Sequence, residues 1–132
     1  MNEQVADRLS LPDPLIAIVG ATDTPSKYGG IIYRDLKAKG FRVVGVNPNR
    51  STVDGDDVYA RLSDLPENPD IVNIVVPPNE TLGIVDEAAA LPNPAVWVQP
   101  GAGDAAVRAR LQELEIPALV GPCIMVEARR TA

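Results

Sequence analysis

The 132-residue sequence contains no histidine. A histidine-dependent catalytic triad, a histidine metal site and phosphohistidine chemistry are therefore excluded from this chain. The one cysteine, Cys123, excludes a disulfide within the chain and fits a reducing cytoplasm. The remaining residues show no metal-ligand cluster and no pair of nucleophile and base, so catalysis has little support.

Long apolar runs are also missing, and basic residues are few. No run approaches the roughly 20 apolar residues of a membrane-spanning helix. Residues 1–14 lack the basic and then apolar order of a signal peptide. The 18 acidic and 12 basic residues leave a net charge of −6, which argues against nucleic acid as a partner. We therefore expect a cytoplasmic chain that forms one domain over residues 1–132, with no nucleic-acid or membrane partner.

Apolar segments of strand length alternate with segments of helical spacing along the chain. Such alternation is typical of a parallel sheet with right-handed crossover helices. We predict an α/β fold, Rossmann-like and doubly wound, with a five-stranded parallel sheet in the order 3-2-1-4-5 and helices on both faces. Asn79 and Asp104 are predicted to cap helices, Trp97 and Cys123 to be buried, and residues 51–69 to form turns. The strands are expected at residues 15–19, 41–46, 71–76, 95–98 and 118–120.

The first strand is followed by Gly20, a loop of small residues and the start of a helix. Doubly wound folds bind phosphate at such a junction, because the helix end offers free N–H groups and small side chains let the backbone approach a ligand. Asp23 in this loop would repel a phosphate, so we expect it to point outward or to cap the backbone. The dinucleotide fingerprint GxGxxG is absent, since only Gly20 of its three glycines is in place.

The end of the second strand lacks the carboxylate that holds the adenosine ribose of a dinucleotide. It reads Val46-Asn47-Pro48-Asn49-Arg50, with a cation instead of an acid. An arginine beside the ribose suits a nucleotide that carries an extra ribose phosphate. NADP and coenzyme A both have that phosphate, and the missing glycines disfavour NADP.

Five segments in order resemble a known family. They read IAIVGATDTPSKYG, GFRVVGVNPNR, VYARLSDLPENPDIVNIVVPP, AVWVQPGA and GPCIMVEARR. Together they extend over about residues 10–130 and resemble the CoA-binding domain family. Its members are similar to the N-terminal domain of the succinyl-CoA synthetase alpha subunit and of ADP-forming acyl-CoA synthetases. The resemblance implies coenzyme A or acyl-CoA as the ligand; those synthetases carry their ligase chemistry in later domains.

The resemblance also implies which residues contact the ligand. The loop after the first strand would hold the pyrophosphate, and the end of the second strand would line the adenosine side, with Arg50 near the 3′-phosphate. The end of the third strand would cover the adenine or ribose, and the end of the fourth would face the pantetheine arm. In that order, the residues are Gly20, Ala21, Thr22 and Lys27; Val46, Pro48 and Arg50; Val76, Pro77 and Pro78; and Gln99, Pro100 and Gly101.

We therefore predict a stand-alone module that binds coenzyme A or acyl-CoA without catalysis, in a regulatory or carrier role. Two alternatives stay open. One is a small NAD(P)-binding reductase or redox sensor, and the other is a subunit that completes an acyl-CoA ligase in trans. The expected protein partner is a second copy of the chain or a ligase subunit.

Overall fold

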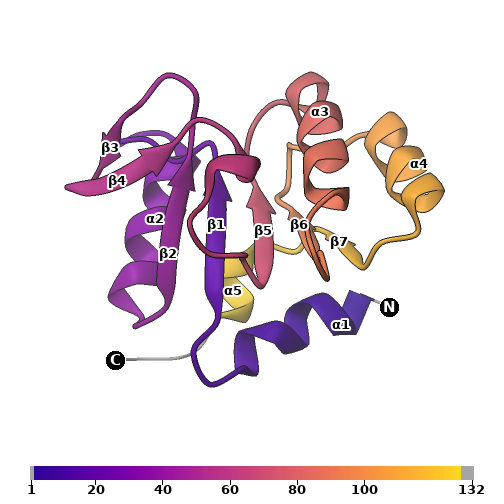
Figure 1. Ribbon diagram of the computed structural model, residues 1–132, viewed down its shortest axis with the longest axis horizontal. Coiled ribbons are helices and arrows are strands. Elements are labelled where there is room, and N and C mark those ends of the chain that lie inside the picture. The colour runs from indigo at the N-terminus through magenta and orange to yellow at the C-terminus, as the bar shows by residue number, and fades with distance from the viewer. Residues whose placement is uncertain (1, 129–132) are drawn as a thin grey trace.

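A seven-stranded sheet forms the centre of the computed structural model, which describes residues 2–128 (Figure 1). The strand order is β3-β4-β2-β1-β5-β6-β7. Neighbouring strands are parallel except in the β3–β4 hairpin at one edge. The strands are β1 (Leu15–Val19), β2 (Arg42–Val46), β3 (Thr52–Val53), β4 (Asp56–Tyr59), β5 (Ile71–Ile74), β6 (Val96–Val98) and β7 (Ala118–Val120).

Helices cover both faces of this sheet, as predicted (Figure 1). Apolar residues of α1, α2 and α5 share one buried cluster, and those of α3 and α4 share the other. The two clusters meet at β1, where Ile16 and Ile18 face one side and Ala17 and Val19 the other. The helices are α1 (Asn2–Asp7), α2 (Tyr28–Ala38), α3 (Pro78–Ala89), α4 (Ala105–Leu114) and α5 (Ile124–Glu127), with 3-10 turns η1 (Arg8–Ser10) and η2 (Leu62–Asp64).

The predicted five-stranded order 3-2-1-4-5 is wrong. The segment expected as the third strand, β5, pairs with β1 and not with β2. The other side of β2 is occupied by β4, in the register Gly45↔Val58 and Val46↔Tyr59. The strand order therefore reverses between β1 and β5, which is where a ligand crevice is expected in such a sheet.

The β3–β4 hairpin lies in the turn-rich segment, residues 51–69, for which no strand was predicted; the tight turn expected at Asp54-Gly55-Asp56 is the turn of this hairpin. Asp54 and Gly55 both have positive φ, 53° and 80°, as a two-residue type I′ hairpin turn requires. An Asp-Gly pair is a strong hairpin signal, but the flanking strands have only two and four residues. Polar residues occupy much of them, because they form the edge of the sheet, so the apolar pattern of a strand is missing.

Two other local predictions need correction. Helix α3 begins at Pro78 with Pro77 as its N-cap residue, not after Asn79, because proline suits the first helical position, where an N–H has no partner in the helix. Cys123 is partly exposed, not buried. By contrast, Asp104 does cap α4, accepting a hydrogen bond from the Val107 N–H at 3.0 Å, and Trp97 is fully buried.

Candidate functional site

The C-terminal ends of β1, β2 and β5 come together around Gly20. Its N–H donates to the Val46 carbonyl oxygen at 2.9 Å, and its φ of 106° is one that residues with a side chain avoid. A Cβ at this position would lie 3.0 Å from Val76 Cγ1. The structure therefore brings three predicted site residues from three strands, Gly20, Val46 and Val76, into one place.

Two glycines at the start of α2 let the helix pack closely on this loop. A Cβ on Gly29 would overlap the Gly20 carbonyl oxygen, and a Cβ on Gly30 would lie 2.6 Å from the Thr22 carbonyl oxygen. In the dinucleotide fingerprint, the third glycine serves this close approach. Gly29 allows the same close approach here, although it lies farther along the chain than the third glycine of the fingerprint. The Gly29-Gly30 pair is the feature of the sequence that could have predicted this contact.

Asn47 was not among the predicted site residues, yet its side chain joins two loops. Its Nδ2 donates to the Ala21 carbonyl oxygen at 2.9 Å, and its Oδ1 accepts from the Asn49 N–H at 2.9 Å. On the same loop, the buried Thr22 accepts from the Thr24 N–H at 3.2 Å. The loop after β1 and the loop after β2 are thus fixed relative to each other.

Three cations surround the loop after β1. Lys27 is the N-cap residue of α2 and is exposed. Arg50 is also exposed and donates to Thr24 Oγ1 at 3.3 Å. A guanidinium nitrogen of Arg34 would lie 3.2 Å from a Cβ on Gly30. Within residues 2–128, none of these cations forms an ion pair with a carboxylate.

Asp23, the acidic residue of the loop after β1, bonds to the backbone of the β3–β4 hairpin. Asp23 Oδ1 accepts from the Asp54 N–H at 2.8 Å, so it caps the backbone of the hairpin turn, as expected. Lys37 pairs with Asp54 at 3.0 Å and with Asp56 at 2.8 Å, and the Tyr33 hydroxyl donates to Asp56 at 2.7 Å. These contacts fasten the hairpin to α2 and to the loop.

The same contacts shift the proton affinities of the two groups that meet at Asp56. The hydrogen bond from Lys37, and after it the one from Tyr33, lowers the pKa of Asp56 below its ordinary value. Burial raises the pKa of Tyr33 well above the ordinary value for tyrosine, and the bond to Asp56 adds to that rise. Tyr33 is therefore a neutral hydrogen-bond donor across the physiological pH range.

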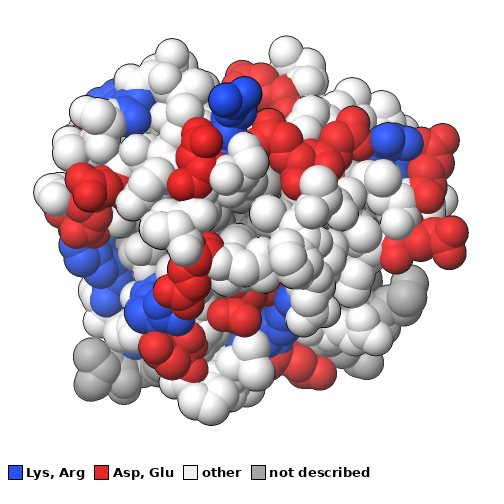
Figure 2. Space-filling model, viewed as in Figure 1, with Lys and Arg blue, Asp and Glu red and all other residues white. Residues whose placement is uncertain are grey.

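Two helices begin at this edge of the sheet, with different electrostatics. In the described part of the chain, no side chain caps α2, and its first turn holds no acidic residue. Helix α3 begins at Pro78 and has Glu80 in its first turn. Figure 2 shows acidic side chains gathered over α3 and α4 on the face that it displays. An anion is therefore favoured at the start of α2, whereas Val76, Pro77 and Pro78 present mainly apolar atoms.

The end of β6 divides into a buried and an exposed part. Gln99 is 2% exposed, and its Nε2 donates to Asn73 Oδ1 at 2.6 Å while its Oε1 accepts from the Ile124 N–H at 3.2 Å. Its side chain therefore ties β5 and β6 to the start of α5. Pro100 and Gly101 are exposed. Asn73, a polar residue within an apolar strand, was the sequence signal for this buried network.

Pro48 is exposed in the loop after β2, next to Asn47. Ala21 is buried and packs against Gly45, since a Cβ added to Gly45 would lie 3.0 Å from the Ala21 Cβ. The structure thus gathers the residues predicted at the ends of β1, β2 and β5, with Pro100 and Gly101 at the end of the adjoining strand β6.

Among residues 2–128, no group of three acidic, cysteine or histidine side chains is arranged to hold a metal ion. Helices in this part of the chain are all too short or too polar to cross a bilayer.

The fold and the order of its strands define a Rossmann-like α/β domain. The comparison with protein families is more specific: the CoA binding domain family matches residues 15–129, and the chain belongs to that family. The family identification drawn from the sequence motifs is confirmed.

Solved and curated relatives include small proteins and ligase domains. A conserved hypothetical protein from Pyrococcus furiosus is 38% identical, with a TM-score of 0.81 over 87% of this chain and 98% of its own. A dinucleotide-forming acetyl-coenzyme A synthetase 1 from Ca. Korarchaeum cryptofilum is 30% identical, with a TM-score of 0.71 over 92% of this chain and 28% of its own. The alpha subunit of an ADP-forming acetate–CoA ligase II from P. furiosus is 35% identical over 63 residues, which are 47% of this chain and 14% of the subunit. The chain is thus a CoA-binding domain related to acyl-CoA ligase subunits, of which it spans less than a third.

Proposed function

We propose that this chain binds coenzyme A or an acyl-CoA at the ends of β1, β2 and β5, as a free-standing, non-catalytic module in a regulatory or carrier role. The observation that carries the proposal is the position of Lys27 and Arg50 beside the loop after β1, without carboxylate partners in residues 2–128. In a chain of net charge −6, two cations that lack a carboxylate partner within residues 2–128, near a helix start that no described side chain caps, favour a ligand with several negative charges.

Each part of the ligand has a proposed contact. The loop Gly20–Thr22 and Lys27 hold the pyrophosphate, because the small residues of the loop let the ligand approach the backbone and the Lys27 ammonium can donate to it. Val46, Pro48 and Arg50 line the adenosine, with Arg50 on the 3′-phosphate. Val76, Pro77 and Pro78 cover the adenine or ribose, and Gln99, Pro100 and Gly101 lie toward the pantetheine arm; the buried Gln99 side chain acts there through the backbone that it positions.

A reductase or redox sensor that binds NAD(P) is the weaker alternative. Asn47 occupies the end of β2, where a carboxylate accepts from the ribose of NAD, and its amide is already engaged with Ala21. A trans-acting ligase subunit has a specific observation in its favour. The relatives named above as ligase and synthetase contain a matching segment within a longer chain.

Isothermal titration calorimetry with CoA, acetyl-CoA, dephospho-CoA, NAD and NADP tests the ligand class. We expect CoA to bind with micromolar to sub-millimolar strength, roughly −5 to −8 kcal/mol, and NAD not to bind. Tight binding of NAD with no heat from CoA would contradict the proposal.

Absence of catalysis needs its own assay. With acid, CoA and a nucleoside triphosphate, the chain alone should form no acyl-CoA above a heat-denatured control. Turnover by the isolated chain would show that it is an enzyme. Turnover that appears only when a ligase subunit with the remaining domains is added would favour the trans-acting alternative over the regulatory or carrier role.

A further inference from the structure

The two edges of the sheet differ in chemistry. At one edge lies β3, a two-residue strand whose Thr52 is exposed and which leads into the charged turn at Asp54. At the other edge lies β7, Ala118-Leu119-Val120, with no polar side chain. Proteins commonly protect edge strands with charged residues, because an open edge pairs with other chains. The β3 edge has that protection, and the β7 edge does not.

The backbone of β7 has hydrogen-bonding groups turned away from the sheet. In the ladder with β6, Val96 N donates to the Pro117 carbonyl oxygen at 3.0 Å, and Gly121 N donates to the Val98 carbonyl oxygen at 2.7 Å. The register Val96↔Ala118 and Val98↔Val120 then places the groups of Leu119 toward β6. Those of Ala118 and Val120 face the open side, where backbone groups seek partners.

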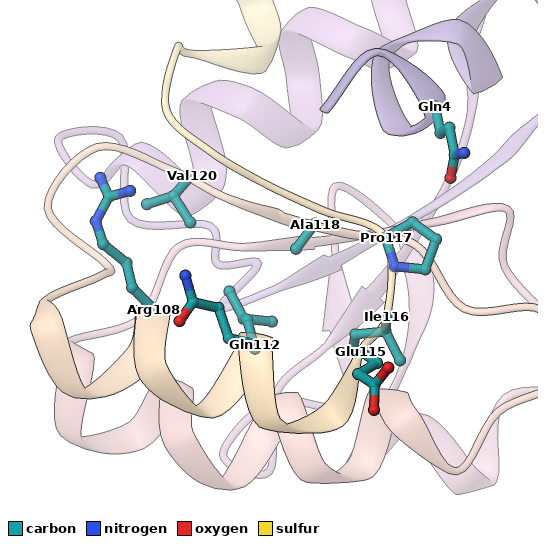
Figure 3. Close-up of a pocket in the computed structure, with 9 residues that line it drawn as sticks. Gln4, Arg108, Gln112, Glu115, Ile116, Pro117, Ala118 and Val120 are labelled. Carbon is teal, nitrogen blue, oxygen red and sulfur yellow. The ribbon is translucent and has the colours of Figure 1, made fainter. Parts of the chain in front are cut away.

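A groove runs along this open edge between β7 and α4, with a volume of about 520 Å³. Figure 3 shows Arg108 toward one end of α4 and Glu115 at the other, with Gln112 between them and Ala118 and Val120 across the groove. Gln4 of α1 lies at its far side. The groove thus has an apolar floor on the edge strand and one charge of each sign at its ends.

The two charges have no ion-pair partner in the described part of the chain. Arg110, on the same helix, pairs with Asp86 at 2.8 Å and with Glu113 at 3.1 Å, whereas Arg108 and Glu115 form no ion pair within residues 2–128. They are separated by two helical turns, about 10 Å along the axis. Rotation of a second copy by 180° about an axis near Gln112 exchanges the two ends of α4.

We propose that a second copy of this chain docks on the α4–β7 edge by two-fold symmetry. In that dimer, the two α4 helices run antiparallel, and Arg108 of each copy lies beside Glu115 of the other. The same rotation makes the two β7 edges antiparallel, with the open groups of Ala118 and Val120 on facing sides. Such an interface is self-complementary, as a two-fold interface must be.

Charge supports a second copy over an unrelated acidic or basic chain. The chain has a net charge of −6, so two copies repel each other over most of their surface. The groove is locally balanced, because Arg108 and Glu115 cancel and Gln112 is neutral. A strongly acidic partner would place like charge against Glu115, and a strongly basic partner would place like charge against Arg108. An antiparallel second copy instead pairs both residues with the opposite charge.

Sedimentation velocity and light scattering on the full chain test the dimer. At roughly 100 µM chain, about tenfold above a dissociation constant of ~10 µM, we expect a weight-average mass about 1.8 times that of the 14.0 kDa chain. Arg108→Glu and Glu115→Arg each create two like-charge contacts per dimer and should raise the dissociation constant at least about tenfold. The double reversal restores both pairs and should return it to within about threefold of the original.

Arg61→Glu is the matched control, since this arginine is exposed and its one ion pair within residues 2–128 is with Asp64, at 4.0 Å. It should leave the dissociation constant unchanged, and circular dichroism should show that every variant is folded. A wild-type chain that stays monomeric at all concentrations would overturn the proposal. So would single reversals without effect, a double reversal that fails to restore the dimer, or an equal loss in the Arg61→Glu control.

Discussion

The side chain of Asn47 donates a 2.9 Å hydrogen bond to the carbonyl oxygen of Ala21. Its other amide atom accepts from the Asn49 N–H, so one side chain bridges the loops after β1 and β2. An aspartate has the same shape but is an acceptor only, and its carboxylate would oppose the Ala21 carbonyl. The bridge therefore requires an amide at the position where a carboxylate binds the ribose of a dinucleotide.

Asn47→Asp should accordingly weaken CoA binding about tenfold and lower the free energy of unfolding by about 1–3 kcal/mol, the cost of an unpaired acceptor. Calorimetry and urea denaturation measure the two effects. Asn68→Ala is the control, because Asn68 donates to the Pro92 carbonyl oxygen at 3.0 Å in another exposed loop. Unchanged CoA affinity in Asn47→Asp would show that the bridge does not position the ligand.

Arg50 is the proposed partner of the 3′-phosphate. Arg50→Ala should weaken CoA binding by about 1.5–3 kcal/mol, the range for hydrogen bonds to charged groups. It should barely change the binding of dephospho-CoA, which lacks that phosphate. Lys27→Ala should weaken both ligands alike, because both keep the pyrophosphate. Equal losses for the two ligands in Arg50→Ala would assign Arg50 to another part of the ligand.

The close packing of α2 on the loop after β1 predicts opposite effects for two helical glycines. Gly29→Ala should lower the free energy of unfolding by about 3 kcal/mol, since its Cβ would overlap the Gly20 carbonyl oxygen. A Cβ added to Gly83 in α3 has no atom within 4 Å, so Gly83→Ala should raise the free energy of unfolding by about 0.5–1 kcal/mol. Thermal and urea unfolding of the two variants give the comparison, and a harmless Gly29→Ala would refute the close contact.

The buried pair Gln99 and Asn73 predicts a stability cost that a surface amide lacks. Gln99→Ala leaves Asn73 Oδ1 and the Ile124 N–H without their partner, at about 2–4 kcal/mol. Asn79→Ala should be neutral, because Asn79 is exposed and is not the N-cap of α3. Reactivity of Cys123, the residue before Ile124, should rise in Gln99→Ala as α5 loosens, which a thiol reagent measures. A Gln99→Ala protein as stable as Asn79→Ala would contradict this reading.

Asp56 links stability to pH. Its pKa is lower in the folded state than in the unfolded chain, so its charge stabilises the fold above about pH 4. That contribution is lost as the pH falls through the folded-state pKa. Asp56→Asn should therefore lose about 1 kcal/mol at pH 7, a small value because its ion pair with Lys37 is half exposed. Below the folded-state pKa, the variant and the wild type should differ little; a difference that stays constant from pH 7 to pH 2 would exclude Asp56 as its source.

Many features of the fold and of the candidate site could be predicted from the sequence, because they depend on residues that are adjacent in the chain. The apolar run of β1 followed by Gly20 predicts a strand and a turn that admits a ligand. The Asp104 cap of α4 and the buried Trp97 likewise follow from residue type and neighbours. The motifs that identify the CoA binding domain family are also short segments of adjacent residues, now matched over residues 15–129.

Tertiary structure decided what depends on partners distant in the chain. The position of β5 beside β1 was set by β4, which takes the free side of β2. The bond from Asn47 to Ala21 and that from Gln99 to Asn73 each join residues 26 positions apart. The sequence alone does not distinguish an amide side chain that is exposed to water from one that is buried against a hydrogen-bond partner. Packing alone selects between these states, because burial removes water as a hydrogen-bond partner and leaves only the protein groups nearby.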